Sequence, residues 1–216
     1  MVATPIEARA LRPIRREQFA HVRRMQDARV GAVVAKILPG EFYATSDDET
    51  IVTTLGSCVS ACLWHPDSGI GGMNHFMLPD GGSAQAGRTD IVAASEGARY
   101  GSFAMEHLIN AILATGLRRE ELVAKIVGGG HVLPIATDIG ASNIAFVRAY
   151  LANEGIAIVG ENVGGNFGRQ VRFHPMSGRA QVRPLAATGA QSVADEEARY
   201  RRAITQTPAA GDVELF

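Results

Sequence analysis

The chain has 216 residues, enough for one well-packed domain with short appendages. Hydrophobic residues make up 46% of it and charged residues 20%, and the net charge of −1 gives no reason to expect nucleic acid or an anionic membrane as a partner. We find no apolar run long enough for a membrane-spanning helix and no signal-peptide pattern, so we expect neither membrane insertion nor secretion.

The chain begins with an arginine-rich segment, residues 1–29, in which a few acidic residues are interspersed. One interpretation is a basic arm that docks on an acidic protein surface. The other is a solvated, partly helical extension. In both cases we predict that the main domain covers residues 30–186.

Two strands are expected before the first cysteine. The segment Val30–Leu38 is apolar and is followed by Pro39 and Gly40, which end a strand. Glu49–Leu55 forms a second strand that leads into the turn Gly56-Ser57-Cys58.

The segment from Thr53 to Pro79 predicts a β-hairpin around the turn His65–Gly69. Folding the hairpin about Pro66 and Asp67 pairs residues whose numbers sum to 133, which places Cys58 opposite His75 with Cβ atoms roughly 5 Å apart. A turn centre displaced by one residue makes them diagonal neighbours, still within reach. A polar, glycine-rich loop follows at Asp80–Asp90, where it could cover this site.

The remaining elements alternate between helices and strands. The pattern predicts a helix from Ala93 or Ser95 to Thr115, a strand at Glu121–Val127, a helix at Ala141–Asn153, a strand at Ile156–Val159 and a hairpin of Gln170–His174 with Ala180–Arg183. Together with the antiparallel hairpins, this order predicts a single-domain α/β sandwich rather than a doubly wound nucleotide-binding fold.

The hydrophobic pattern stops at about Ala186. Ala194–Arg202 is highly charged and is expected to form a short helix at most. We predict that residues 187–216 are a flexible tail. The apolar residues Leu215 and Phe216 allow a second interpretation, a docking peptide at the end of the chain.

Cys58 and His75 are the strongest candidates for catalysis. A buried cysteine is often only a small core residue, and a histidine on a strand is often structural. A thiol beside an imidazole, however, is the arrangement that a cysteine nucleophile needs, because the imidazolium stabilises the thiolate. The backbone N–H groups near Gly56 and Ser57 could stabilise an oxyanion.

Other chemistries find little support in the sequence. Cys58 and Cys62 are the only cysteines, and on one strand they would lie roughly 13 Å apart, too far for a disulfide. We therefore expect free thiols in a reducing compartment. The six histidines show no metal-binding spacing, and Gly128–Gly130 lacks the lysine of a phosphate-binding loop. We expect no metal and no cofactor, and interpret these glycines as sites of close backbone packing.

Several motifs resemble the CheD family of chemoreceptor glutamine deamidases. They are LGSCV and, seventeen residues after its cysteine, the histidine of MNHFMLP, together with LPGEFYAT, AKIVGGG, IGASNIAFVRAYLANEGI and ENVGGNFGRQVRF. The similarity runs in order from about Val33 to Arg183, which is most of the chain.

This resemblance implies an α/β sandwich whose catalytic core is similar to that of bacterial toxin deamidases. It implies a cytoplasmic protein-glutamine glutaminase that converts glutamines of methyl-accepting chemotaxis receptors to glutamate through a cysteine thioester. The cytoplasmic region of these receptors and a CheC-type phosphatase are the implied partners. In the family a threonine before the cysteine orients the histidine, which assigns this role to Thr53 or, as the alternative, to Thr54.

Two rival functions remain open at this point. One is a cysteine hydrolase that acts on a different amide or on a peptide bond. The other is a non-catalytic adaptor that binds receptors or the CheC phosphatase. The presence of both Cys58 and His75 argues against pure binding.

Overall fold

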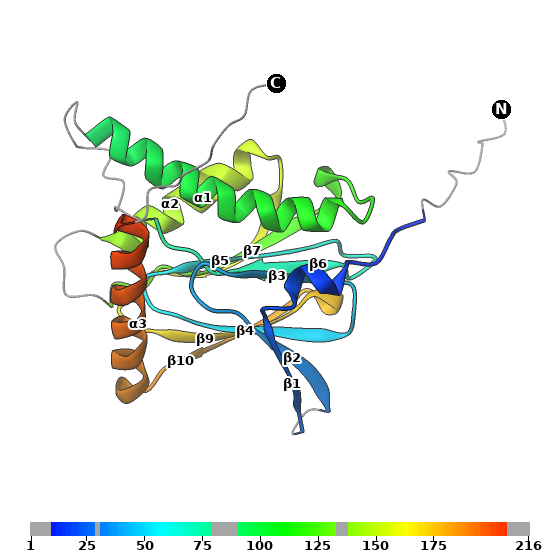
Figure 1. The fold of residues 1–216 in the computed structure, drawn as a ribbon, viewed down its shortest axis with the longest axis horizontal. Coiled ribbons are helices and arrows are strands. Elements are labelled where there is room, and N and C mark those ends of the chain that lie inside the picture. The colour runs from blue at the N-terminus through cyan, green and yellow to red at the C-terminus, as the bar shows by residue number, and fades with distance from the viewer. Residues whose placement is uncertain (1–9, 29–30, 79–89, 133–137, 207–216) are drawn as a thin grey trace.

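The strands of the computed structural model pair into two five-stranded sheets, and helices cover one of them (Figure 1). The structure describes residues 10–28, 31–78, 90–132 and 138–206. The first sheet has the order β1 (Arg23–Asp27), β2 (Ala32–Lys36), β4 (Glu49–Leu55), β9 (Arg169–His174) and β10 (Arg179–Pro184). The second has the order β3 (Phe42–Thr45), β6 (Gly71–Asn74), β5 (Val59–Trp64), β7 (Val123–Gly128) and β8 (Ala157–Val163).

Helices α1 (Asp90–Leu113) and α2 (Ile139–Asn153) lie on the second sheet. Helix α1 contacts β3 and β6, and α2 contacts β7 and β8. Helix α3 (Ala187–Gln206) follows β10 and crosses the ends of the strands toward the other helices (Figure 1). Three short 3₁₀ helices complete the described elements: η1 (Arg16–Phe19), η2 (Arg119–Glu121) and η3 (Pro175–Ser177).

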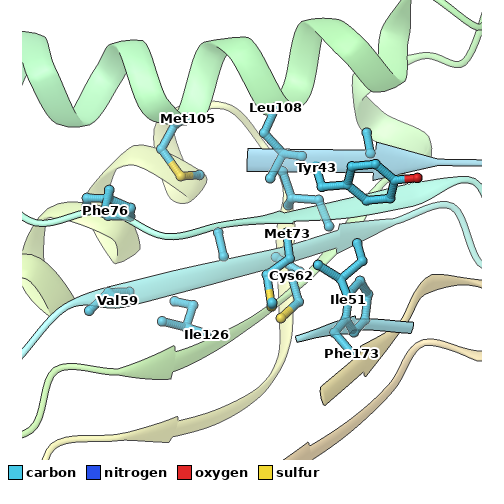
Figure 2. Packing of buried hydrophobic residues seen from close by; sticks show 14 of the residues in the cluster. Tyr43, Ile51, Val59, Cys62, Met73, Phe76, Met105, Leu108, Ile126 and Phe173 are labelled. Carbon is cyan, nitrogen blue, oxygen red and sulfur yellow. The ribbon is translucent and has the colours of Figure 1, made fainter. Parts of the chain in front are cut away.

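The second sheet is the middle layer of the fold (Figure 1), and its strands β5 and β6 are buried on both faces, whereas the edge strand β8 is largely exposed. Every residue of β5 is buried, because one face of the strand packs against the helices and the other against the first sheet. Figure 2 shows this arrangement: Met105 and Leu108 of α1 lie on one side of the sheet, and Ile51 and Phe173 of the first sheet lie on the other. The active-site cysteine candidate, Cys58, directly precedes this fully buried strand.

The predicted class, an α/β sandwich with antiparallel hairpins, is confirmed. Strand β4 has the predicted bounds and alternates between buried and half-buried residues. The hairpin of β9 and β10 also forms as predicted, with Gly178 in the left-handed conformation at its turn.

The N-terminal segment takes part in the fold, which differs from the extension expected from the sequence. Strand β1 pairs with β2, so the predicted boundary near residue 30 runs through the first sheet. Phe19 is 2% exposed and packs edge-on against Phe42 and Tyr43. Arg24 forms an ion pair with the buried Glu49. The many arginines of this segment led to the prediction of a solvated extension. The strand pairing, the packing of Phe19 and the Arg24–Glu49 ion pair instead hold it against the domain.

Helix α3 is longer than the short helix expected within Ala194–Arg202. Val193 and Glu197 are buried against the domain, so the chain up to Gln206 packs as an element of the fold. The predicted covering loop at residues 80–90, the proposed docking peptide and the first nine residues fall almost entirely outside the described residues. Among the helices that are described, none has the length and apolar character needed to span a membrane.

Candidate active site

The hairpin that carries Cys58 and His75 has a different register from the predicted one. Strands β5 and β6 pair Cys62 with Met73, and an isolated bridge pairs Val59 with Phe76. Paired residue numbers thus sum to 135, not 133, because the turn is centred one residue later, with Gly69 in the left-handed conformation. Cys58 and His75 are therefore diagonal neighbours, the alternative that the sequence left open.

The cysteine turn is held by the glycines that follow β7. Gly130 N–H donates to the carbonyl oxygen of Gly56 at 2.7 Å, and Gly129 N–H donates to that of Cys58, also at 2.7 Å. A Cβ atom at Gly128 would lie 2.3 Å from the Cys58 carbonyl oxygen. Only glycine allows this approach, which confirms the interpretation of the triplet as close backbone packing.

His75 is fixed by hydrogen bonds to its backbone and to its ring. Its N–H donates to the carbonyl oxygen of Glu41 at 2.9 Å, and its own carbonyl accepts from Gly40 N–H at 2.8 Å. The ring Nδ1 lies 2.8 Å from Thr53 Oγ1. Because the Thr53 hydroxyl donates to the carbonyl oxygen of Ile37 at 2.9 Å, its oxygen accepts from Nδ1–H. This assigns the tautomer in which Nε2 carries a lone pair, and Nε2 has no hydrogen-bond partner among the described residues.

The two threonines before the cysteine have different surroundings. Thr53 is 2% exposed and faces the interior, whereas Thr54, one residue later on β4, lies on the opposite face of the strand. Of the two, only Thr53 is placed against the His75 ring. Its role in orienting the imidazole stays a prediction, and the Thr53→Val variant would test it.

Glu197 of α3 is a site residue that the sequence did not reveal. Its side chain is 1% exposed and lies over the cysteine turn. One carboxylate oxygen accepts hydrogen bonds from the N–H groups of Gly56 and Cys58, at 2.8 and 3.1 Å. The other accepts from the N–H and the hydroxyl of Ser57, both at 2.7 Å. The predicted oxyanion donors thus bind a carboxylate in this structure.

The sequence did contain one signal for this contact. Val193 and Tyr200 lie four residues before and three residues after Glu197, so all three share one face of the helix. The hydrophobic character of this stripe was masked by the charged residues around it.

Asn143 is a second residue that the sequence did not single out. It is fully buried on α2, and its side-chain amide donates to the carbonyl oxygen of Ser57 at 2.9 Å. Its amide oxygen accepts from Leu78 N–H, also at 2.9 Å. Asn143 therefore joins the cysteine turn to the segment that follows His75.

Cys58, His75 and Glu197 form a compact cluster in which one thiol, imidazole and carboxylate atom each lie within 4.8 Å of one another. Such groups can in principle hold a metal ion. Here both oxygens of Glu197 already accept hydrogen bonds from the cysteine turn, so the donors of the chain itself satisfy the carboxylate.

The surroundings of the cluster favour the neutral forms of the thiol and the imidazole. Burial, and after it the negative charge of Glu197, raise the pKa of Cys58 well above its usual range. Burial lowers the pKa of His75 to about 4, against the smaller opposing effect of Glu197. With Glu197 in place, the site holds a thiol rather than a thiolate, which is the less nucleophilic form.

We expect Thr53→Val to lower the catalytic activity of this site by roughly tenfold to a hundredfold, because the ring would lose the acceptor that fixes its tautomer. Losses of this size are typical for groups that orient a functional histidine. Thr54→Val is the matched control and should keep most of the activity. The measurement is the catalytic rate together with its pH profile. Thr53→Val should shift this profile if the His75 ring changes its tautomer or orientation. Equal losses in both variants would remove Thr53 from this role.

We also expect the protein to lose stability as the pH falls from about 6.5 to about 4. His75 takes up a proton near pH 6.5 when the chain is unfolded, but only near pH 4 when it is folded, so the unfolded state binds more protons in this window. The loss from this residue is at most about 3 kcal/mol. Urea unfolding at pH 7 and pH 4.5 measures it, and His75→Asn should show a smaller difference. The same difference in both proteins would contradict the assignment.

Comparisons with known proteins agree on one family. The family model described as CheD chemotactic sensory transduction matches residues 77–184. A protein of Halorhodospira halophila is 47% identical over 199 residues, which cover 92% of this chain and 91% of that protein. Proteins of Hydrogenovibrio crunogenus and Methylobacillus flagellatus are 48% and 50% identical, over 88% and 84% of this chain and 97% and 89% of their own lengths.

Each of these three relatives is named a probable chemoreceptor glutamine deamidase CheD. The identity is near one half and covers almost the whole length of both proteins. The match is therefore not limited to a shared fragment, and the proteins have the same fold. The chain belongs to the CheD family.

Proposed function

We propose that this protein is a protein-glutamine glutaminase that deamidates glutamines in the cytoplasmic region of methyl-accepting chemotaxis receptors. The names of its relatives support the reaction and the class of substrate. One observation on this chain carries the chemistry. The Cys58 thiol, the His75 Nε2 atom and three backbone N–H groups surround the place where a side-chain carboxyl group binds, and within the described part of the chain Nε2 has no hydrogen-bond partner.

In the first half of the reaction, His75 Nε2 takes the thiol proton and Cys58 Sγ attacks the carboxamide carbon. The N–H groups of residues 56–58 stabilise the negative oxygen that forms. An amide ion is too basic to leave, so the His75 imidazolium returns the proton to the nitrogen as the C–N bond breaks. Ammonia departs, and a thioester on Cys58 remains.

In the second half, His75 acts as a base toward water. The water gives a proton to Nε2 and attacks the thioester carbon, while the same N–H groups hold the oxyanion. The Cys58–carbon bond then breaks, and the imidazolium returns the proton to the departing sulfur, which restores the thiol and releases glutamate. The product is an anion where the substrate was neutral. It binds the same donors that hold the Glu197 carboxylate in this structure.

Two further assignments rest on the resemblance and are proposed with the function. A receptor-modifying enzyme of this kind would work in the cytoplasm, where its two free cysteines stay reduced. A CheC-type phosphatase is the proposed second partner.

The test is mass spectrometry of a purified receptor cytoplasmic fragment incubated with the full-length protein. Conversion of glutamine to glutamate adds about one dalton to the peptide that contains it, because an NH₂ group is exchanged for OH. We expect this gain at specific glutamines and release of an equal amount of ammonia. A fragment that binds the protein but shows no mass gain would instead favour the adaptor function.

A further inference from the structure

Helix α3 reaches the active site from a distance of more than 120 residues along the chain. It leaves the first sheet after β10, where Leu185 N–H donates to the carbonyl oxygen of Gly168 at 2.8 Å. It then crosses the strand ends toward α1 (Figure 1). Tyr200 meets Tyr100 of α1 through their hydroxyl groups, and its hydroxyl also approaches Gly40.

The contacts of α3 fall on both halves of the candidate catalytic site. Glu197 binds the turn that carries Cys58, and Tyr200 lies against Gly40, whose N–H holds the backbone of His75. A Cβ atom at Gly56 would lie 2.7 Å from a Glu197 carboxylate oxygen. The lack of a side chain at residue 56 therefore makes room for the carboxylate. With the helix in place, Cys58 is completely buried and His75 is 2% exposed.

The group that α3 places in the site is the product of the proposed reaction. Deamidation turns a glutamine side chain into a glutamate side chain, and α3 presents a glutamate side chain from a helix. Its carboxylate lies where the deamidated carboxyl group would be released, within 4.8 Å of the thiol and bound by the proposed oxyanion donors. Four hydrogen bonds to one carboxylate are more than a packing contact needs.

We propose that α3 is an intramolecular product analogue, which occupies the active site through Glu197 and must be displaced before a receptor glutamine can bind. This inference rests on the proposed function and adds to it that the site accepts glutamine presented by a helix. The residue four positions before the target glutamine would be apolar, as Val193 is, and the residue three positions after it would lie against Gly40, as Tyr200 does.

The bound helix restrains the reaction in two ways. It covers the thiol, so a substrate carboxamide has no access to it. It also places a carboxylate beside the sulfur, where a second negative charge is unfavourable, so thiolate forms less readily. Displacement of α3 by a receptor helix would remove both restraints at once.

The sharpest test converts the analogue into a substrate. In Glu197→Gln, the carboxamide takes the place of the carboxylate, so Cys58 can attack its carbon, release ammonia and, after hydrolysis by water, regenerate glutamate at position 197. We expect the peptide that contains residue 197 to gain about one dalton, restoring the wild-type mass, within the lifetime of the purified full-length protein.

Two matched variants control this experiment. Glu197→Gln combined with Cys58→Ala should keep its glutamine, which excludes spontaneous deamidation. Glu196→Gln places the carboxamide one residue away on the same helix, and it should also remain unchanged. Conversion of Gln at position 196 as fast as at position 197, or conversion without Cys58, would overturn the proposal.

A second measurement does not depend on deamidation. Glu197→Ala removes the carboxylate while the chain stays complete, and Glu196→Ala is its control. We expect iodoacetamide to label Cys58 roughly tenfold faster or more in Glu197→Ala than in the wild type, and to do so at lower pH. In the wild type, Glu197 belongs to the same chain as the thiol and therefore covers it at a high effective concentration, and the substitution removes this cover. Cys62, also fully buried, serves as the internal reference. Labelling in the presence of EDTA excludes protection by a bound metal ion.

The two proposals fail in distinguishable ways when the receptor fragment is assayed in parallel. If the fragment is deamidated while position 197 keeps its glutamine and Cys58 labelling is unchanged in Glu197→Ala, the role of α3 is wrong and the enzymatic function stands. If nothing is deamidated but Cys58 labels faster in Glu197→Ala, occupation of the site by α3 is supported and the reaction is wrong.

Discussion

Cys58→Ala is expected to abolish conversion of receptor glutamines to glutamate, with a rate loss on the order of 10⁴-fold or more, as for the removal of other covalent nucleophiles. The sulfur forms the bond that replaces the C–N bond, and alanine offers no atom that can do so. The measurement is the fraction of deamidated receptor peptide over time, determined by mass spectrometry at equal enzyme concentration.

Cys62→Ala is the matched control for this loss. Cys62 lies four residues later, within β5, is equally buried and is the second free cysteine, yet it is paired with Met73 and is not part of the Cys58 cluster. This variant should fold and keep most of the activity. Equal activity of Cys58→Ala and the wild type would mean that a different group is the nucleophile.

His75→Ala is expected to lower the rate by roughly a hundredfold to ten-thousandfold, the usual contribution of general acid–base catalysis. Once Glu197 has been displaced, the imidazole is the only group in the described part of this cluster that can take the thiol proton and protonate the departing nitrogen. The burst of ammonia from the first turnover should also be lost, because the acylation step needs the proton donor.

His107→Ala is the corresponding control, since His107 is exposed on α1 and contacts the rings of Phe42 and Phe103. It should retain nearly full activity. The pH profile gives an independent check, because the acidic limb of the rate should be present in His107→Ala and absent from any residual activity of His75→Ala. The same acidic limb in both variants would assign it to another group.

The covered active site affects how these rates should be interpreted. In the described structure Cys58 and His75 are buried and held in their neutral forms, so the structure represents a resting state under our proposal for α3. Substrate binding then includes the displacement of a helix. Substitutions that weaken the packing of α3 should raise the deamidation rate when Cys58 is present. The same substitutions should leave the protein inactive when combined with Cys58→Ala.

Much of the fold could be predicted from local patterns. The strand Glu49–Leu55 and the terminal hairpin were recognisable because alternation and turn residues depend on near neighbours in the chain. Cys58 and His75 could be chosen because they flank the two strands of one hairpin, whereas Thr53 was chosen through the resemblance to the CheD family. The register was predicted one turn position too early, since a glycine-containing turn can be closed at more than one residue.

What the sequence by itself determined is the set of chemical groups: a thiol, an imidazole, a threonine hydroxyl and a small-residue turn, ordered as in the CheD family. Only the tertiary structure decided how they are used. The inward face of β4 places Thr53, and not Thr54, beside the His75 ring, and the hydrogen bond from Thr53 to Ile37 leaves Nε2 as the nitrogen of His75 without a partner among the described residues. Glu197 lies 139 residues from Cys58, so its place depends on how a whole helix packs. The spacing of Val193 and Tyr200 indicates which face of the helix is buried, but not what that face contacts, because the backbone donors that bind Glu197 come together only in the folded chain.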